Sequence, residues 1–146
     1  MKIYKIAQEY RTIDEDSDFD QIDAAWNVFK DNKIRPNRNK DISDIALSDG
    51  TVIGAVASGW DKDDNKATFS FDIAINNNHQ GMKIGTNLVK QALERYNNDK
   101  SSYKEMGYDT EIELEAINIK FGEYLVRQFG FEVVRKLADR LILRKE

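Results

Sequence analysis

The chain has 146 residues, of which 40% are apolar and 33% are charged, and its formal net charge is −4. This length suits one ordinary domain with a sizeable core, so we expect a single domain over residues 1–146. The acidic balance and the lack of a basic block argue against DNA or RNA as a partner. With no cysteine and one histidine, the chain offers no disulfide framework or thiol chemistry, and we expect no metal site.

Hydropathy gives no sign of a membrane partner. No run of 18 apolar residues is present, which is about the length of a membrane-spanning helix. The first ten residues lack the long apolar core of a secretion signal. We therefore expect a cytoplasmic protein.

The first third of the chain predicts a strand and a helix. Residues 2–8 alternate as a strand does. An acidic segment, 14–23, leads into an apolar stripe with helical spacing, and we expect Ser17 or Asp16 to cap this helix. The stripe consists of Phe19, Ile22, Trp26 and Phe29. Residues 33–40 contain the only proline and four basic residues, and read as a loop that is either solvated or near an anion.

Three strands follow, at 42–48, 51–60 and 66–76. Asp49-Gly50 between the first two is a strong hairpin signal. A polar turn at 63–65 joins the second to the third. We expect an antiparallel meander.

The second half predicts further helices and strands. Ile84, Leu88, Ala92 and Tyr96 share one face of a helix over 84–96. Residues 99–110 read as a loop and 111–118 as a strand. A short helix buries Phe121, Leu125 and Phe129 and stops at Gly130, and a closing hairpin spans 131–137 and 140–145. The order predicts an α/β (α+β type) fold with one mixed sheet.

The connection from the strand at 66–76 to the helix at 84–96 carries the most chemical information. A helix start presents backbone N–H groups with no partner inside the helix, and together with the helix dipole they attract phosphate. The connecting residues are Gln80, Gly81, Met82, Lys83, Ile84 and Gly85. The three-glycine Rossmann fingerprint and the G-K-[ST] of nucleoside triphosphatases are both missing. The sequence therefore predicts a strand–loop–helix cradle for an anion.

This segment resembles the acetyl-CoA signature of the GNAT N-acetyltransferase superfamily. Ile73-Ala74-Ile75 matches the end of the family's strand, and Gln80, Ile84 and Gly85 match three of its fixed points. Lys83 departs from the family, which has glycine there; its ammonium either attracts a phosphate or narrows the site. The resemblance implies a mainly antiparallel sheet of six or seven strands, flanked by helices, with a splay between strands four and five.

The same resemblance implies where acetyl-CoA binds. The pyrophosphate would lie on residues 80–86, which end at Thr86, and the pantetheine arm would pair with the backbone of Ile73, Ala74 and Ile75. The N–H of Ile75 would receive the oxyanion. Asn118 is similar to the family asparagine that touches the arm.

The catalytic groups are less family-like. In the stretch Leu125–Phe131, Val126 stands where the family often has a tyrosine that protonates the leaving thiolate. Tyr124 is an alternative acid or a packing residue. Removal of the amine proton needs a base, and the candidates are Asp72, Glu113 and Glu115, each of which is otherwise part of a solvated sheet face.

Two functions follow from the resemblance. The first is transfer of an acetyl group from acetyl-CoA to a primary amine of a small-molecule or peptide acceptor, by direct attack. The second is a GNAT-fold protein that binds CoA or a partner without turnover. A monomer and a homodimer both remain open.

Overall fold

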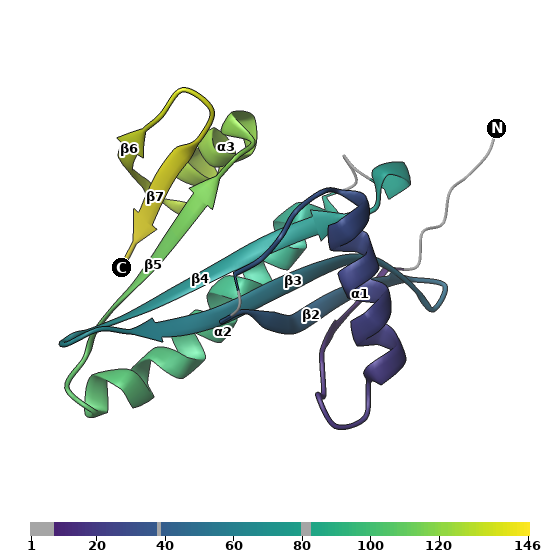
Figure 1. The fold of residues 1–146 in the computed structure, drawn as a ribbon, viewed down its shortest axis with the longest axis horizontal. Coiled ribbons are helices and arrows are strands. Elements are labelled where there is room, and N and C mark those ends of the chain that lie inside the picture. Colours follow the sequence, from purple (N-terminus) through teal and green to yellow (C-terminus); the bar gives the residue numbers. More distant parts are fainter. Residues whose placement is uncertain (1–7, 38, 80–82) are drawn as a thin grey trace. The chain divides into compact units, whose positions relative to one another are not determined.

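The computed structural model describes residues 8–37, 39–79 and 83–146. Within these ranges the chain forms seven strands and three α-helices (Figure 1). In chain order they are β1 (Gln8–Thr12), α1 (Phe19–Asp31), β2 (Asp41–Ser48), β3 (Thr51–Lys62), β4 (Lys66–Ile75), α2 (Ile84–Glu105), β5 (Asp109–Ala116), α3 (Ile119–Phe129), β6 (Glu132–Lys136) and β7 (Leu141–Lys145), with a 3₁₀ turn at Asn77–His79 before α2.

The strands form one sheet in the order β1-β2-β3-β4-β5-β7-β6. Strand β2 is antiparallel to β1 and β3, and β7 is antiparallel to β5 and β6. Parallel pairs join Lys66–Phe69 of β4 to Asp109–Ile112 of β5. Because β4 continues to Ile75 and β5 to Ala116, the two strands pair at their N-terminal ends only, as the predicted splay requires. The expected α/β class with a mixed, mainly antiparallel sheet is confirmed.

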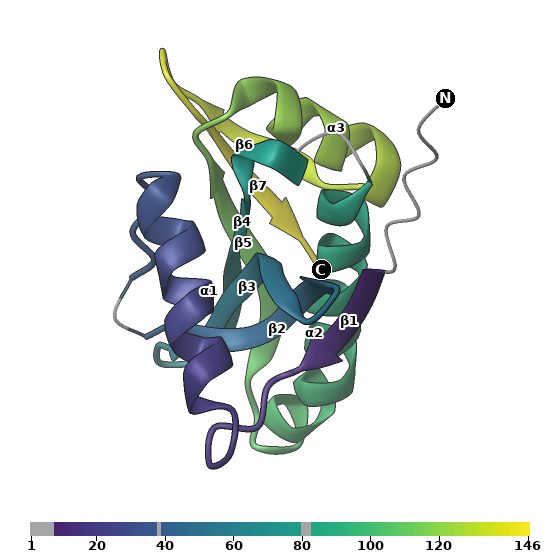
Figure 2. The same cartoon turned by 90° about the vertical axis from the view of Figure 1, so that its right-hand side faces the viewer.

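The chain divides into two compact units. The first comprises the described residues up to Ser58 together with Phe71–Arg95. In it, α1 and the first half of α2 lie on opposite faces of β2 and β3 (Figures 1 and 2). The core under α1 is built from alanines, branched aliphatic residues and one aromatic residue, namely Ala25, Val28, Phe29, Ile42, Ile45, Leu47, Val52, Ala55, Ala57 and Ala74. The predicted stripe of α1 supplies Phe29 to this core, whereas Phe19 is exposed.

The start of α1 corrects the predicted cap. The N-cap residue is Asp18, not Ser17 or Asp16, and its side chain makes no capping bond. Its carboxylate instead pairs with Arg11 on β1 at 2.6 Å. The guanidinium of Arg11 holds the pKa of Asp18 below its ordinary value. A stronger partner from a neighbouring element therefore draws this side chain away from the helix end.

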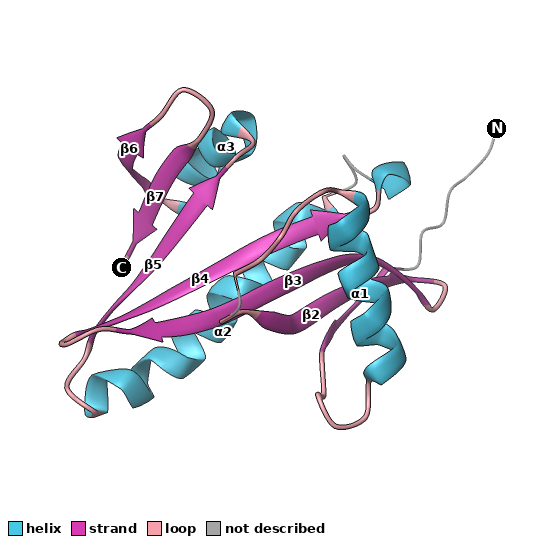
Figure 3. Cartoon of the chain, viewed as in Figure 1, coloured by secondary structure: helices cyan, strands magenta, loops and turns pink. Residues whose placement is uncertain are grey.

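The second unit comprises Gly59–Ser70 and Tyr96–Glu146. Helix α3 lies against β5 and β7 (Figure 3). The close approach depends on Gly122, since a Cβ there would lie 2.9 Å from Cβ of Ala116 and 3.0 Å from Cδ1 of Leu141. The helix ends at Gly130 in the left-handed conformation, with φ of 74°, as predicted.

Helix α2 is longer than predicted, because residues 99–105 are helical rather than a loop. This segment is polar except for one aromatic residue, Tyr103, which packs against β3. Tyr103 stacks on Trp60 with ring centroids 4.2 Å apart, and Tyr96 stacks on the same indole at 5.5 Å. Gly107, with φ of 93°, follows the helix.

The other local predictions fare unevenly. The strand expected at 2–8 lies almost wholly outside the described residues, and the strand described is β1 at Gln8–Thr12. Asp49 and Gly50 have φ of 50° and 79°, which is the two-residue hairpin geometry that the sequence predicts. The expectation of a single domain stays a prediction.

Candidate functional site

The end of β4 has one edge paired with β3 and one edge turned away from it. The N–H of Asn76 donates to the carbonyl of Ile53 on β3 at 2.7 Å. In an extended strand the N–H and C=O of one residue point to the same side, and successive residues point to opposite sides. The backbone of Ile75, and by the same alternation that of Ile73, therefore faces the edge away from β3. Ala74 lies between them and is buried under α1.

The start of α2 lies beside this strand end. The N–H of Asn87 donates to the carbonyl of Lys83 at 3.2 Å, so Lys83 is the residue that precedes the helix. Ile84, Gly85 and Thr86 thus form the first turn, whose N–H groups precede the first hydrogen bond described within the helix. Gln80, Gly81 and Met82, which the sequence assigns to the same cradle, lie outside the described residues.

Lys83 has φ of 62°, the left-handed region that costs most residues except glycine about 1–2 kcal/mol. The family glycine at this position has a physical reason here, because the chain must turn through a positive φ to enter α2. Lys83 adopts this positive φ despite the steric strain that its Cβ causes there. Its side chain is exposed.

The small residues of this region serve close packing. A Cβ on Gly85 would lie 3.2 Å from Cδ1 of Ile75, and a Cβ on Gly54 would lie 3.1 Å from Cδ1 of Leu88. These glycines let α2 start close against β3 and β4. Gly85 was predicted as a cofactor-binding residue from its family position alone. The structure adds that its lack of a side chain leaves room for Cδ1 of Ile75.

The predicted base Asp72 already has a cationic partner. Its Oδ2 lies 2.7 Å from Nζ of Lys40, which is only 8% exposed. Since side chains alternate along a strand, Asp72 shares the face of Ala74, the side that α1 covers. Sequence reasoning did not find Lys40, because the pair joins positions far apart in the chain and no local pattern marks it.

The other predicted carboxylates lie on β5, in the second unit. Glu115 forms an ion pair with Arg140, which also binds Asp139 at 3.0 Å. These two carboxylates raise the pKa of Arg140, and the guanidinium lowers the pKa of Asp139. Glu113 is exposed and, among the residues that the structure describes, takes part in no ion pair.

Two further predicted residues have structural tasks on α3. Asn118 is the N-cap of this helix, and its Oδ1 accepts a hydrogen bond from the N–H of Phe121 at 3.1 Å. The signal for that role was present, since asparagine is among the best N-cap residues. Tyr124 is half-buried between the rings of Phe121 and Phe129, with centroids at 6.1 and 5.9 Å. Val126 is half-buried too.

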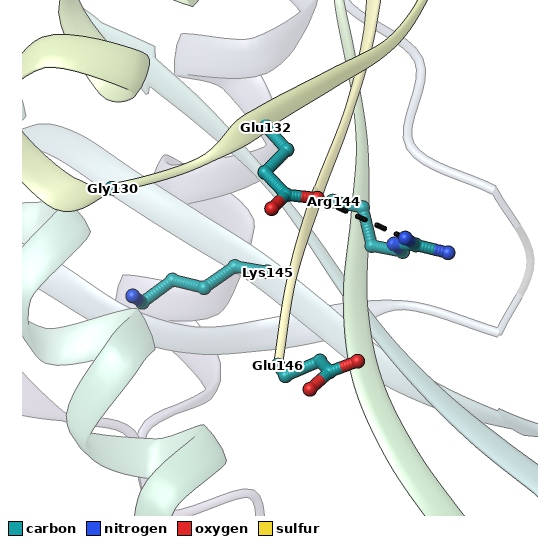
Figure 4. Close-up of a pocket in the computed structure, with 5 residues that line it drawn as sticks. All are labelled: Gly130, Glu132, Arg144, Lys145 and Glu146. Atoms are coloured by element: carbon teal, nitrogen blue, oxygen red, sulfur yellow. Dashed lines mark ion pairs between the residues drawn. The ribbon is translucent and has the colours of Figure 1, made fainter.

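The structure thus brings the predicted residues together in two sets. Asp72, Ile73–Ile75 and Lys83–Thr86 belong to the first unit, whereas Glu115, Asn118 and Tyr124 belong to the second. A cavity of about 270 Å³ in the second unit contains none of them (Figure 4). It is lined by Gly130, Glu132, Arg144, Lys145 and Glu146, with Arg144 3.8 Å from Glu132.

Two kinds of feature are absent from the described part of the chain. No group of three or more histidine, cysteine or carboxylate side chains there is arranged to hold a metal ion. None of the helices described is both long and apolar enough to cross a bilayer.

Comparison with known proteins defines the class. The family model described as "Acetyltransferase (GNAT) family" matches residues 1–119. The chain belongs to this family. Among curated proteins, none matches the chain significantly.

Several solved structures share the fold at low sequence identity. Naa50 from Arabidopsis thaliana, solved with the bisubstrate analogue CoA-Ac-MVNAL, is 14% identical with a TM-score of 0.64 over 97% of this chain and 99% of its own. The NatC complex bound to Gag peptide and CoA gives 15% and 0.69 over 94% and 95%. The aminoglycoside acetyltransferase meta-AAC0020 from an uncultured soil metagenomic sample gives 14% and 0.60 over 90% and 92%.

Proposed function

We propose that this chain transfers an acetyl group from acetyl-CoA to a primary amine of an acceptor. The observation that carries the proposal is membership of the GNAT acetyltransferase family over residues 1–119. Acetyl-CoA is the co-substrate. The start of α2 lies beside the edge of β4 that faces away from β3, and a helix N-terminus of this kind favours a phosphate, which supports the same conclusion.

The cofactor would bind chiefly through backbone. The pyrophosphate would lie on the first-turn amides at Ile84–Thr86 and on residues 80–83. The pantetheine arm would run along the edge presented by Ile73 and Ile75, and the N–H of Ile75 would receive the oxyanion. Asn118 can contribute only its amide nitrogen or its free lone pair, because Oδ1 already caps α3.

The reaction needs few side chains. The neutral amine attacks the thioester carbon, the C–S bond breaks, CoA leaves as thiolate, and the amine loses a proton. Asp72 and Glu115 are the proposed proton acceptors, and both carry a cationic partner. Tyr124 is the proposed acid for the thiolate. Holding amine and thioester together supplies much of the rate in any case.

The acceptor class follows from the relatives. Two of the similar structures hold peptide-derived ligands and a third belongs to an aminoglycoside acetyltransferase. We therefore propose a peptide or small-molecule amine as acceptor for this chain.

A second candidate is a protein that binds CoA without turnover. Val126 favours it, because an aliphatic side chain cannot give a proton to the thiolate. The two candidates agree on cofactor binding and differ only in catalysis.

Calorimetry with acetyl-CoA, followed by thiol release over a panel of amines, separates these outcomes. The proposal expects binding and CoA release with at least one peptide or small-molecule amine. Binding with no thiol release across the panel would favour the second candidate. No heat signal at millimolar cofactor would reject both.

A further inference from the structure

The side chain of Asn32 joins the end of α1 to the end of β4. Its Nδ2 donates to the carbonyl of Val28 at 2.8 Å and to the carbonyl of Ile75 at 3.1 Å. Both partners are carbonyl oxygens, so only the nitrogen of the amide can face them. Asn32 follows the last residue of α1, and the carbonyl of Val28 accepts from both its side chain and its backbone N–H, the latter at 3.2 Å.

The peptide between Ile75 and Asn76 is consequently held from both sides. Its carbonyl accepts from Asn32, and its N–H donates to Ile53 on β3 at 2.7 Å. A peptide is planar, so bonds at both ends fix its orientation. The Ile75–Asn76 peptide is the last peptide of β4 on the edge that faces away from β3.

A second bond fastens the same connection to the same strand. The α1–β2 connection runs from Asn32 to Lys40, and Lys40 binds Asp72 of β4 at 2.7 Å. Between these two anchors, Ile34 donates its N–H to the carbonyl of Phe29 at 3.0 Å and packs on the core under α1. The connection is therefore tied to β4 at both of its ends.

We propose that Asn32 is a positioning residue for the acyl arm of the cofactor. The inference rests on the proposed function, in which the backbone of Ile75 receives the thioester oxygen. By fixing the Ile75–Asn76 peptide, Asn32 sets the backbone torsion of Ile75 and so the direction in which the strand edge presents its groups. Neither of these two side-chain bonds goes to the start of α2 at Lys83–Thr86, so we expect the change to act on the arm.

Affinities for two ligands distinguish a role in positioning the arm from a general structural role. Acetyl-CoA carries the arm, whereas 3′-phospho-ADP is its nucleotide end without the arm. In Asn32→Asp, an oxygen of similar size faces the two carbonyls and cannot donate. We expect acetyl-CoA affinity to fall about tenfold, the scale of one lost hydrogen bond to a positioned group. Affinity for 3′-phospho-ADP should stay within about twofold.

Two more variants complete the experiment. Asn27→Asp makes the same chemical change at an exposed position of α1 and should leave both affinities unchanged. Asn32→Ser can still bond the carbonyl four residues back, at Val28, but is too short to reach Ile75. It should reproduce the selective loss for acetyl-CoA even if Asn32→Asp folds poorly.

Hydrogen exchange at the amide of Asn76 tests, without any ligand, whether Asn32 fixes the Ile75–Asn76 peptide. It should accelerate in both Asn32 variants and not in Asn27→Asp. Three results would overturn the inference. The first is an equal loss of affinity for acetyl-CoA and 3′-phospho-ADP. The others are an unchanged acetyl-CoA affinity in Asn32→Ser and an unchanged exchange rate of the Asn76 amide. Failure of the unaltered protein to bind acetyl-CoA would instead refute the proposed function.

Discussion

At the scale of single residues, Lys83 stands where the resemblance places a glycine and adopts a backbone conformation that suits glycine. Its φ of 62° is the conformation for which glycine is suited. The sequence identified the departure from the family but not its conformation, because a backbone angle at a loop residue is set by the elements that it joins.

Replacement of Lys83 by glycine should therefore stabilise the fold. We expect Lys83→Gly to raise the free energy of unfolding by about 0.5–1 kcal/mol, since relief of the left-handed strain exceeds the extra entropy of an unfolded glycine. Lys83→Ala removes the same charge and keeps the strain, so it should show no such gain. Urea titration measures both, and an equal gain in the two variants would contradict the account.

Gly122 gives the opposite prediction. Its missing Cβ would lie 2.9 Å from Ala116, closer than real side chains approach. Gly122→Ala should lower the free energy of unfolding by about 1–3 kcal/mol, as overpacking does. Glu123→Ala, at the exposed neighbouring position of α3, should change it little. A Gly122→Ala variant that melts at the original temperature would show that α3 has room to move away.

At the scale of elements, the sequence predicted β2, β3, β4, α3 and the closing hairpin well, because each has a clear period or a specific turn. It placed the end of α2 at Tyr96, whereas the helix ends at Glu105. The polar residues 99–105 have no apolar stripe, and Tyr103 is fixed by Trp60, a contact that local pattern cannot reveal. Asn32 and Lys40 escaped notice for the same reason.

The start of α2 permits a test in which stability and binding move apart. Thr86→Glu places a carboxylate in the first turn, where it should maintain or raise helix stability by interaction with the dipole, by about 0.3–1 kcal/mol. The same charge should repel a pyrophosphate and lower acetyl-CoA affinity at least about tenfold. Ser101→Glu makes the same change at an exposed site farther along α2 and should bind normally. Unchanged affinity in Thr86→Glu, by calorimetry, would place the pyrophosphate elsewhere.

The aromatic cluster around Trp60 predicts a loss of stability in alkali. Burial raises the pKa of Tyr96 and of Tyr103 above the ordinary value. A raised folded-state pKa means that the unfolded chain ionises first, so stability is complete below about pH 10 and falls as pH rises past it. Tyr103→Phe should make unfolding less dependent on pH between 9 and 11. Identical pH profiles for the variant and the original chain would contradict this.

At the scale of the whole molecule, the family and the fold could be predicted from the sequence, whereas the partners of the candidate catalytic groups could not. Strand and helix periods and a short glycine motif suffice for a fold that is built from backbone pairing. Asp72 and Glu115 have the right chemistry for a base, but their cationic partners, Lys40 and Arg140, come from distant positions. A single sequence shows which residues can carry a charge, but not which residues from distant positions form ion pairs with them.

The central claim is that the first turn of α2 and the edge of β4 that faces away from β3 hold acetyl-CoA. Titration of ¹⁵N-labelled protein with acetyl-CoA, read at the backbone amides, tests it residue by residue. The account predicts the largest shifts at Ile84, Gly85, Thr86 and Ile75, saturating together with one dissociation constant. Saturating shifts confined to other parts of the chain, or none at millimolar cofactor, would contradict it.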